Sequence, residues 1–135
     1  MEKFKFLEHT ADIKFQAFGK SVEEVFENSA LAMSNAMYDG KVEKKKKIKI
    51  KVEGKDFESL LYNFLEEFLF LFDSKNFLFG EVKNLRIDKF KLESEVLGDK
   101  ASNYNFTRDV KAVTYNEMFV KKQNNKWIAQ VVLDV

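Results

Sequence analysis

DFESLLYNFLEEFLFLFD, residues 56–73, contains the richest apolar run of the chain. The carboxylate of Asp56 can cap a backbone amide, so a helix is expected to follow it over the rest of the stretch. The apolar run is shorter than the ~20 residues that cross a bilayer, and it includes Asn63, Glu66 and Glu67. The pattern therefore predicts a deeply buried helix with these residues inward: Phe57, Leu60, Leu61, Phe64, Leu65, Phe68, Leu69 and Phe72.

An earlier helix is expected after the segment SVEE, residues 21–24. The Ser21 hydroxyl can cap a backbone amide while Glu24 reaches back to the Ser21 amide, which is the capping-box pattern. The helix begins at Val22 and ends at Asp39-Gly40. One buried face follows the spacing of a helix and contains Val22, Val25, Phe26, Ser29, Ala30, Met33 and Met37.

Alternating patterns predict strands on both sides of these helices. Apolar and polar residues alternate over 3–8 and 12–18, which predicts two strands joined by a turn near HTA, residues 9–11. In KVEKKKKIKIKVEGK, residues 41–55, isoleucine and valine alternate with lysine, which favours a half-buried edge strand with a solvated lysine face. Further extended patterns cover 77–82, 85–98, 108–122 and 126–135.

The order of these elements predicts an α+β fold. Two strands, a helix, a strand, a second helix and about four strands give ββαβα followed by strands, with about six to seven strands in all. Short connections favour antiparallel pairing, and two main helices covering one face complete a mostly antiparallel sandwich. Residues 1–135 are expected to form one domain.

Composition excludes several classes of function. The 23 basic and 22 acidic residues leave a formal net charge of +1, which predicts no strong attraction to nucleic acid or to an anionic membrane. The chain has no cysteine and one histidine, so any metal must be held mainly by oxygen. The N-terminus lacks the apolar segment of a signal peptide, and a cytoplasmic location is expected.

No common catalytic motif is present. The sequence lacks GxSxG, GxGxxG, GxxxxGK[ST] and HExxH, and its one imidazole, His9, cannot complete a triad without partners. An enzymatic function is therefore not expected. His9 precedes Thr10 in the expected turn, where a ring nitrogen that binds nearby backbone groups is the ordinary explanation.

Two acidic residues lie at the ends of expected strands. Asp12 precedes the alternating segment 13–17, and Asp134 interrupts the last apolar run one residue before Val135, which offers a terminal carboxylate and a carbonyl. If the first and last strands are neighbours, three oxygen groups could converge. Calcium or magnesium prefers such ligands, and solvated strand-end acids are the alternative.

Four segments together resemble the archease family. They are the opening FKFLEHTADIKFQAFGKSVEEVFENSALAM, the helical KDFESLLYNFLEEFLFLF, the late VKAVTYNEMFV and the ending KWIAQVVLDV. The resemblance covers essentially the full chain and keeps the order of the motifs. It implies a non-enzymatic activator of the GTP-dependent tRNA-splicing RNA ligase, which joins 3′-phosphate or 2′,3′-cyclic phosphate ends to 5′-hydroxyl ends.

The resemblance also implies how such a protein acts. It would promote guanylylation of the active-site histidine of the ligase, restore turnover and broaden nucleotide use. The site that it implies is a divalent metal site, most often calcium with magnesium or manganese as alternatives, held by Asp12, Asp134 and Val135. His9, Lys111 and Tyr115 would be polar or partner contacts near that end.

Two positions depart from the family pattern. Asn116 follows Tyr115 where many members have histidine, and Gly98-Asp99 replaces a Gly-Glu pair that precedes an acidic, histidine-bearing loop. The alternative function is a general chaperone-like or RNA-binding adaptor that uses the apolar helix or the lysine strand. A third is a hydrolase with His9 as base.

Overall fold

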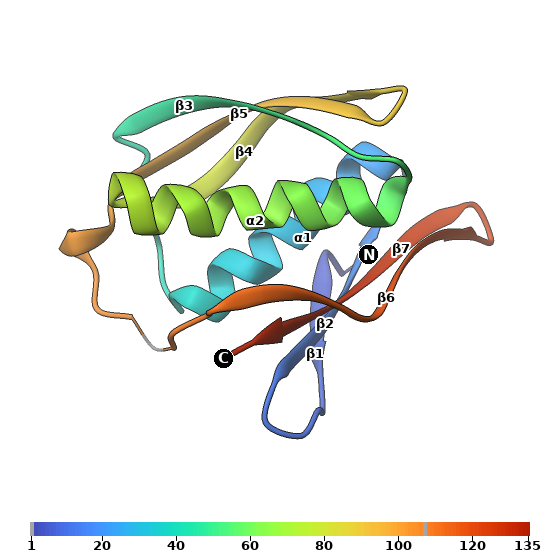
Figure 1. The fold of residues 1–135 in the computed structure, drawn as a ribbon, viewed down its shortest axis with the longest axis horizontal. Coiled ribbons are helices and arrows are strands. Elements are labelled where there is room, and N and C mark those ends of the chain that lie inside the picture. Colours follow the sequence, from blue (N-terminus) through green and yellow to red (C-terminus); the bar gives the residue numbers. More distant parts are fainter. Residues whose placement is uncertain (1, 107) are drawn as a thin grey trace.

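The computed structural model describes residues 2–106 and 108–135 (Figure 1). Over these residues the chain alternates strands and helices in the order that the sequence predicts, which confirms the α+β class. The elements are β1 (Phe4–Leu7), β2 (Ile13–Gly19), α1 (Val22–Met37), β3 (Lys46–Glu53), α2 (Phe57–Lys75), β4 (Phe77–Asp88), β5 (Lys91–Lys100), a short 3₁₀ helix (Ala101–Asn103), β6 (Ala112–Gln123) and β7 (Lys126–Asp134).

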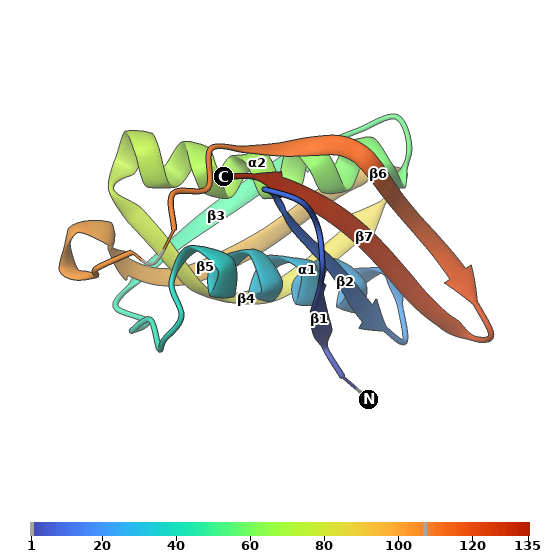
Figure 2. The same cartoon turned by 90° about the horizontal axis from the view of Figure 1, so that it is seen from below.

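The strands form two antiparallel sheets with both helices between them (Figures 1 and 2). One sheet has four strands in the order β1-β2-β7-β6, and the other has three in the order β3-β5-β4. Each helix contacts strands of both sheets. The helices therefore cover one face of each sheet. Helices on one face were predicted, but local sequence patterns did not indicate that the strands divide into two sheets.

The predicted face of α2 supplies much of the core. Leu60, Leu61, Phe64 and Leu65 are fully buried, and the ring of Phe68 stacks on Phe79 of β4 with centroids 3.9 Å apart. Burial of such side chains stabilises a fold by roughly 1.5–3 kcal/mol each relative to exposure. Among the described residues, no helix combines the length and the apolar character needed to cross a membrane.

Polar residues within this apolar helix bind the open edges of both sheets. The side-chain amide of Asn63 donates to the backbone carbonyl of Glu53 on edge strand β3 at 2.8 Å. On edge strand β6, the amide of Val113 donates to Glu66 at 2.8 Å and that of Val120 donates to Glu58 at 3.0 Å. Because an open edge leaves backbone groups without a strand partner, these contacts explain why the helix carries polar residues there.

The helix boundaries agree with the sequence to within about two residues, with one correction at a cap. The Glu24 amide donates to the Ser21 hydroxyl at 3.1 Å, as expected. The Glu24 carboxylate, however, accepts from the amide of Lys20 at 2.9 Å instead of that of Ser21. At α2 the reciprocal box is formed by Asp56 with Ser59.

The predicted strand boundary near residues 83–84 is wrong. β4 continues through this region to Asp88, with an irregular register between Lys83 and Arg86 and a positive φ of 53° at Asn84. The chain reverses instead at Lys89 and Phe90, which have φ of 50° and 59°. Lysine and phenylalanine are not typical of a left-handed turn, so composition gave no signal for this hairpin.

Relieving the left-handed backbone at this turn should stabilise the protein. Lys89→Gly is expected to raise the free energy of unfolding by about 0.5–1 kcal/mol, because glycine adopts positive φ without a Cβ clash. The matched change Lys91→Gly, within β5, should instead lower it by a similar amount, about 0.5–1 kcal/mol. Urea denaturation measures both, and equal signs would contradict the prediction.

Candidate functional site

The two candidate metal-binding aspartates lie at the ends of neighbouring strands, Asp12 one residue before β2 and Asp134 as the last residue of β7. β2 pairs with β7, and the last registered pair is Ile13 with Leu133. Asp12 and Asp134 each lie one residue beyond this pair, and β6 pairs Ala112 with Asp134 on the other side of β7. Residues directly opposite in an antiparallel pair share a face of the sheet. The end of β7 lies next to the β1–β2 turn in both views (Figures 1 and 2).

A tight turn presents Asp12. Its amide donates to the carbonyl of Thr10 at 2.8 Å, and Ala11 between them has a positive φ of 68°. Asp12 is half-buried and Asp134 is exposed. On the β6 side, the amide of Lys111 donates to the Asp134 carbonyl at 2.8 Å, which holds the end of β7 in the sheet. The turn and the sheet thus bring both carboxylates to one end of the molecule.

The lone histidine does not bind nearby backbone groups, contrary to its ordinary explanation. His9 Nε2 lies 3.0 Å from a carboxylate oxygen of Glu117 in β6, and the other oxygen accepts from Lys14 Nζ at 3.0 Å. These contacts hold the pKa of Glu117 below its usual range, chiefly through the Lys14 and then the His9 hydrogen bonds. His9 Nδ1 is buried without a hydrogen-bond partner among the described residues. Glu117 therefore joins the β1–β2 turn to the far edge of the sheet.

A bulge in β6 places Glu117. Its register with β7 breaks between Thr114 and Phe119, and Glu117 has a positive φ of 55°. The carbonyl of Glu117 accepts from the Gln130 side chain at 2.8 Å, and Gln130 accepts from Gln16 at 2.9 Å. Bulges commonly re-aim a side chain. Sequence reasoning missed Glu117 because no glycine marks the bulge and the alternation of β6 looks regular.

The remaining candidate contacts lie in different surroundings. Tyr115 stacks on Tyr62 of α2 with centroids 4.2 Å apart and leaves 54% of its surface exposed. The pKa of Tyr115 is raised chiefly by its partial burial and to a smaller extent by nearby Tyr62 and Asp56. Lys111 and Asn116 are exposed, and the Asn116 amide donates to the Thr114 hydroxyl at 3.3 Å. Tyr115 therefore contacts the helix layer, whereas Lys111 joins the end that contains Asp134.

The chemistry of this end fits a hard cation that keeps an open coordination shell. Two carboxylates and the backbone oxygens of residues 134–135 are the oxygen donors at hand. Within 2–106 and 108–135 there is no cluster of three or more His, Asp or Glu side chains that could enclose an ion. Calcium takes 6–8 oxygen ligands and tolerates irregular geometry. This donor set would leave several positions for water or for oxygen atoms of a partner.

Gly98-Asp99 does not contribute to that end. Asp99 is buried at the end of β5, where it accepts from the Tyr104 hydroxyl at 2.8 Å and from the Lys100 amide at 2.8 Å. The Tyr104 oxygen in turn accepts from the Glu43 amide at 2.9 Å. The hydrogen bond from Tyr104, followed by that from the Lys100 amide, lowers the pKa of Asp99. The carboxylate thus ties two connecting segments to the second sheet.

Acid should remove the stabilisation that Asp99 provides. A carboxyl whose pKa is lowered by folding stabilises the protein above its unfolded pKa of about 3.9 and loses this effect as pH falls through the folded value. Asp99→Asn should therefore lower the free energy of unfolding at pH 7, and the difference from wild type should shrink below about pH 4. Urea denaturation at both pH values tests this, with exposed Asp88→Asn as the control. A difference independent of pH would contradict it.

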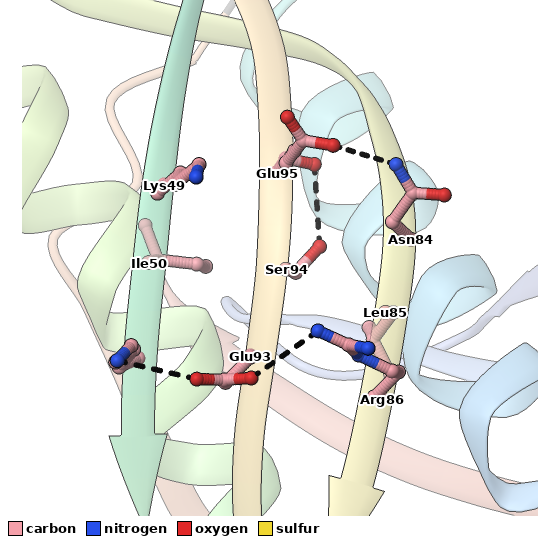
Figure 3. Close-up of a pocket in the computed structure, with 9 residues that line it drawn as sticks. Lys49, Ile50, Asn84, Leu85, Arg86, Glu93, Ser94 and Glu95 are labelled. Carbon is pink, nitrogen blue, oxygen red and sulfur yellow. Dashed lines mark hydrogen bonds and ion pairs between the residues drawn. The ribbon is translucent and has the colours of Figure 1, made fainter.

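A surface hollow lined by charged residues lies on the outer face of the three-stranded sheet (Figure 3). It has a volume of about 620 Å³, and its lining includes Glu93 and Glu95. Glu93 contacts Lys51 at 3.2 Å and Arg86 at 3.5 Å, and Glu95 contacts Lys47 at 3.1 Å. β3 is an edge strand with a lysine face, as predicted. Lys47 and Lys51 are thus each paired with a glutamate of β5.

Comparison with known proteins gives a consistent set of matches. The family model described as "Archease protein family (MTH1598/TM1083)" matches residues 4–135. A protein archease of Methanosarcina barkeri is 41% identical over 141 residues, covering 99% of this chain and 97% of that protein. A protein archease of Pyrococcus abyssi is 40% identical over 142 residues, with 100% of both chains covered.

Two solved structures are also similar. The solution structure of protein 1598 of Methanobacterium thermoautotrophicum has a TM-score of 0.87 and 35% identity, and 100% of both chains is covered. The crystal structure of a Thermotoga maritima archease, described as a possible chaperone, has a TM-score of 0.64, with 97% of this chain and 96% of that one covered. Its identity is 18%, so this second likeness concerns the fold alone.

Proposed function

The chain belongs to the archease family, and from this membership we propose that it activates a GTP-dependent tRNA-splicing RNA ligase. Family membership supports a role in RNA ligation and tRNA processing as an accessory protein. The finer proposal is that the protein promotes transfer of GMP to the active-site histidine of the ligase. It thereby sustains multiple turnover and widens the choice of nucleotide, and it works in the cytoplasm.

The observation that supports this proposal is the pairing of β2 with β7, whose last registered pair, Ile13 with Leu133, lies one residue from both Asp12 and Asp134. Like charges close together on a sheet cost stability, so a pair of carboxylates here calls for a compensating cation. Asp12, Asp134 and a backbone oxygen of Val135 would hold calcium, with magnesium or manganese as alternatives. A bound cation would supply positive charge toward phosphate groups.

The residues of this end act on the partner by position and charge. The carboxylates would hold a cation at this end of the sheet, and that cation would supply positive charge toward phosphate oxygens of the nucleotide on the ligase. Lys111, exposed beside Asp134, adds a second positive group for these phosphates. His9, the one histidine of the chain, contacts Glu117 within the protein through its imidazole.

A guanylylation assay tests the proposal. The purified ligase is incubated with labelled GTP, with and without this protein, at substoichiometric amounts of activator and with either calcium or a chelator. We expect labelled ligase to accumulate faster with the protein and calcium together. Equal rates with and without the protein would refute the proposal.

The RNA-binding adaptor remains separable by one further measurement. Binding of the protein alone to a labelled tRNA half is measured at low and moderate salt. Phosphate contacts would give an affinity that falls steeply with salt. Because Lys47 and Lys51 are paired with glutamates on β5, we expect weak binding with little dependence on salt.

A further inference from the structure

We propose that Glu117 is a positioning residue for the cation end, because it fixes the turn around Asp12 and keeps the Lys14 ammonium from occupying the place of the cation. This inference rests on the proposed function. It concerns a residue that neither the motifs nor the family comparison singled out.

The contacts of Glu117 flank Asp12 on both sides. His9 lies three residues before Asp12 and Lys14 lies two residues after it, and each lies 3.0 Å from one oxygen of the same carboxylate. One side chain therefore holds both ends of the short segment that presents Asp12. The only other described hydrogen bond within this turn is that between Asp12 and Thr10.

Lys14 is the nearest competitor for the cation's place. Lys14 of β2 pairs with Val132 of β7, so these two residues share a face of the sheet. Asp134 lies two residues after Val132 on β7 and shares that face, and Asp12 lies two residues before Lys14. A Lys14 ammonium without Glu117 would find the two carboxylates as the alternative counter-charges, because its side chain is only 18% exposed.

The bulge in β6 makes this contact possible from a distant strand. β7 separates β6 from β2 in the sheet, so a regular β6 residue would not approach Lys14 directly. From a backbone with φ of 55°, the Glu117 side chain contacts His9 and Lys14 across β7. The side chain of Gln130 in β7 donates to the Glu117 carbonyl at 2.8 Å. A strained backbone conformation that persists with such support is typical of a site that positions a functional group.

Calcium titration calorimetry tests the proposal on the full chain. Glu117→Gln, which keeps the size of the side chain, should weaken calcium binding by about five- to tenfold, because one positive charge is then free beside the carboxylates. Adding Lys14→Gln to Glu117→Gln should restore the affinity to within about twofold of Lys14→Gln alone, since the competing charge is gone. Glu95→Gln, which removes a carboxylate bound to Lys47 and Asn84 on the other sheet, should change nothing.

Two outcomes would overturn the proposal. One is a calcium affinity in Glu117→Gln that equals that of wild type. The other is a double variant as weak as Glu117→Gln, which would exclude competition by Lys14. Thermal unfolding of each variant shows whether it is folded at the titration temperature. The double variant should regain calcium affinity if Glu117→Gln acts through the Lys14 charge, but not if Glu117→Gln causes a folding defect.

Hydrogen exchange separates this proposal from the proposed function. If wild type binds no calcium, the cation site itself fails, and the exchange rate of the Asp12 amide decides the positioning role. That amide donates to the Thr10 carbonyl. Faster exchange in Glu117→Gln than in wild type and Glu95→Gln would support positioning, and an unchanged rate would overturn it.

Discussion

Alanine at Asp12 or at Asp134 is expected to abolish the stimulation of ligase guanylylation. Each replacement removes one of the two aspartate side chains that would hold the cation. Because even the loss of a supporting contact costs a metal site 10–100-fold in affinity, losing a ligand should weaken calcium binding by at least about 100-fold. Calorimetry and the guanylylation assay should report the loss together.

The same variants should not lose stability without calcium. Carboxylates close enough to share a cation repel each other without it, so removing either charge should leave the unfolding temperature of the calcium-free protein unchanged or raise it slightly. Calcium should raise the unfolding temperature of wild type alone, since a ligand that binds only the folded state stabilises it. Asp88→Ala, an exposed acid on the other sheet, is the matched control. Stimulation that persists in both aspartate variants would refute the site.

Helices and the lysine strand could be predicted because their signals are local. Asp56 and Ser21 mark helix starts through hydrogen bonds within four residues, and apolar spacing marks the buried faces. The alternation over β3 similarly records which side of one strand is covered. Such patterns depend on neighbours in the chain, and no distant contact is needed to interpret them.

The missed features depend on contacts between distant segments. The division into two sheets follows from which strands pair, and β2 pairs with β7 more than a hundred residues away. Glu117 meets His9 at a separation of 108 residues, so its role has no local sequence signal. The turn at Lys89 and Phe90 was missed for another reason, because lysine and phenylalanine do not favour positive φ. The ring of Phe90 packs on that of Phe57, with ring centroids 5.0 Å apart.

The candidate aspartates could be predicted only in part from the sequence. Their place at strand ends was visible in the sequence, but their proximity depended on whether the two strands are neighbours. Resemblance to the archease family implied a shared site of Asp12, Asp134 and Val135, and the pairing of β2 with β7 shows that the two strands are neighbours. Whether a cation binds there stays a prediction that calorimetry decides.

Gly98→Ala is expected to disrupt the second sheet. A Cβ at Gly98 would fall within contact distance of the Leu78 carbonyl oxygen and 2.8 Å from the Cα of Phe79, both in the backbone of β4. Backbone atoms cannot rotate away, so β4 and β5 would have to separate. The free energy of unfolding should fall by about 3 kcal/mol or more, at the upper end of overpacking effects. Urea denaturation measures the change.

Gly40→Ala provides the matched control for this change. Its Cβ would approach the outer ring atoms of Tyr38 at 2.8 Å, and the end of this half-buried side chain can shift more easily than backbone, so an effect well below that of Gly98→Ala is expected. Gly98 has no positive φ, which makes space rather than backbone conformation the reason for glycine. At a temperature where Gly98→Ala remains folded, its calcium affinity should match wild type, because the aspartates lie on the other sheet. Reduced affinity in the folded variant would instead assign Gly98-Asp99 to the cation end.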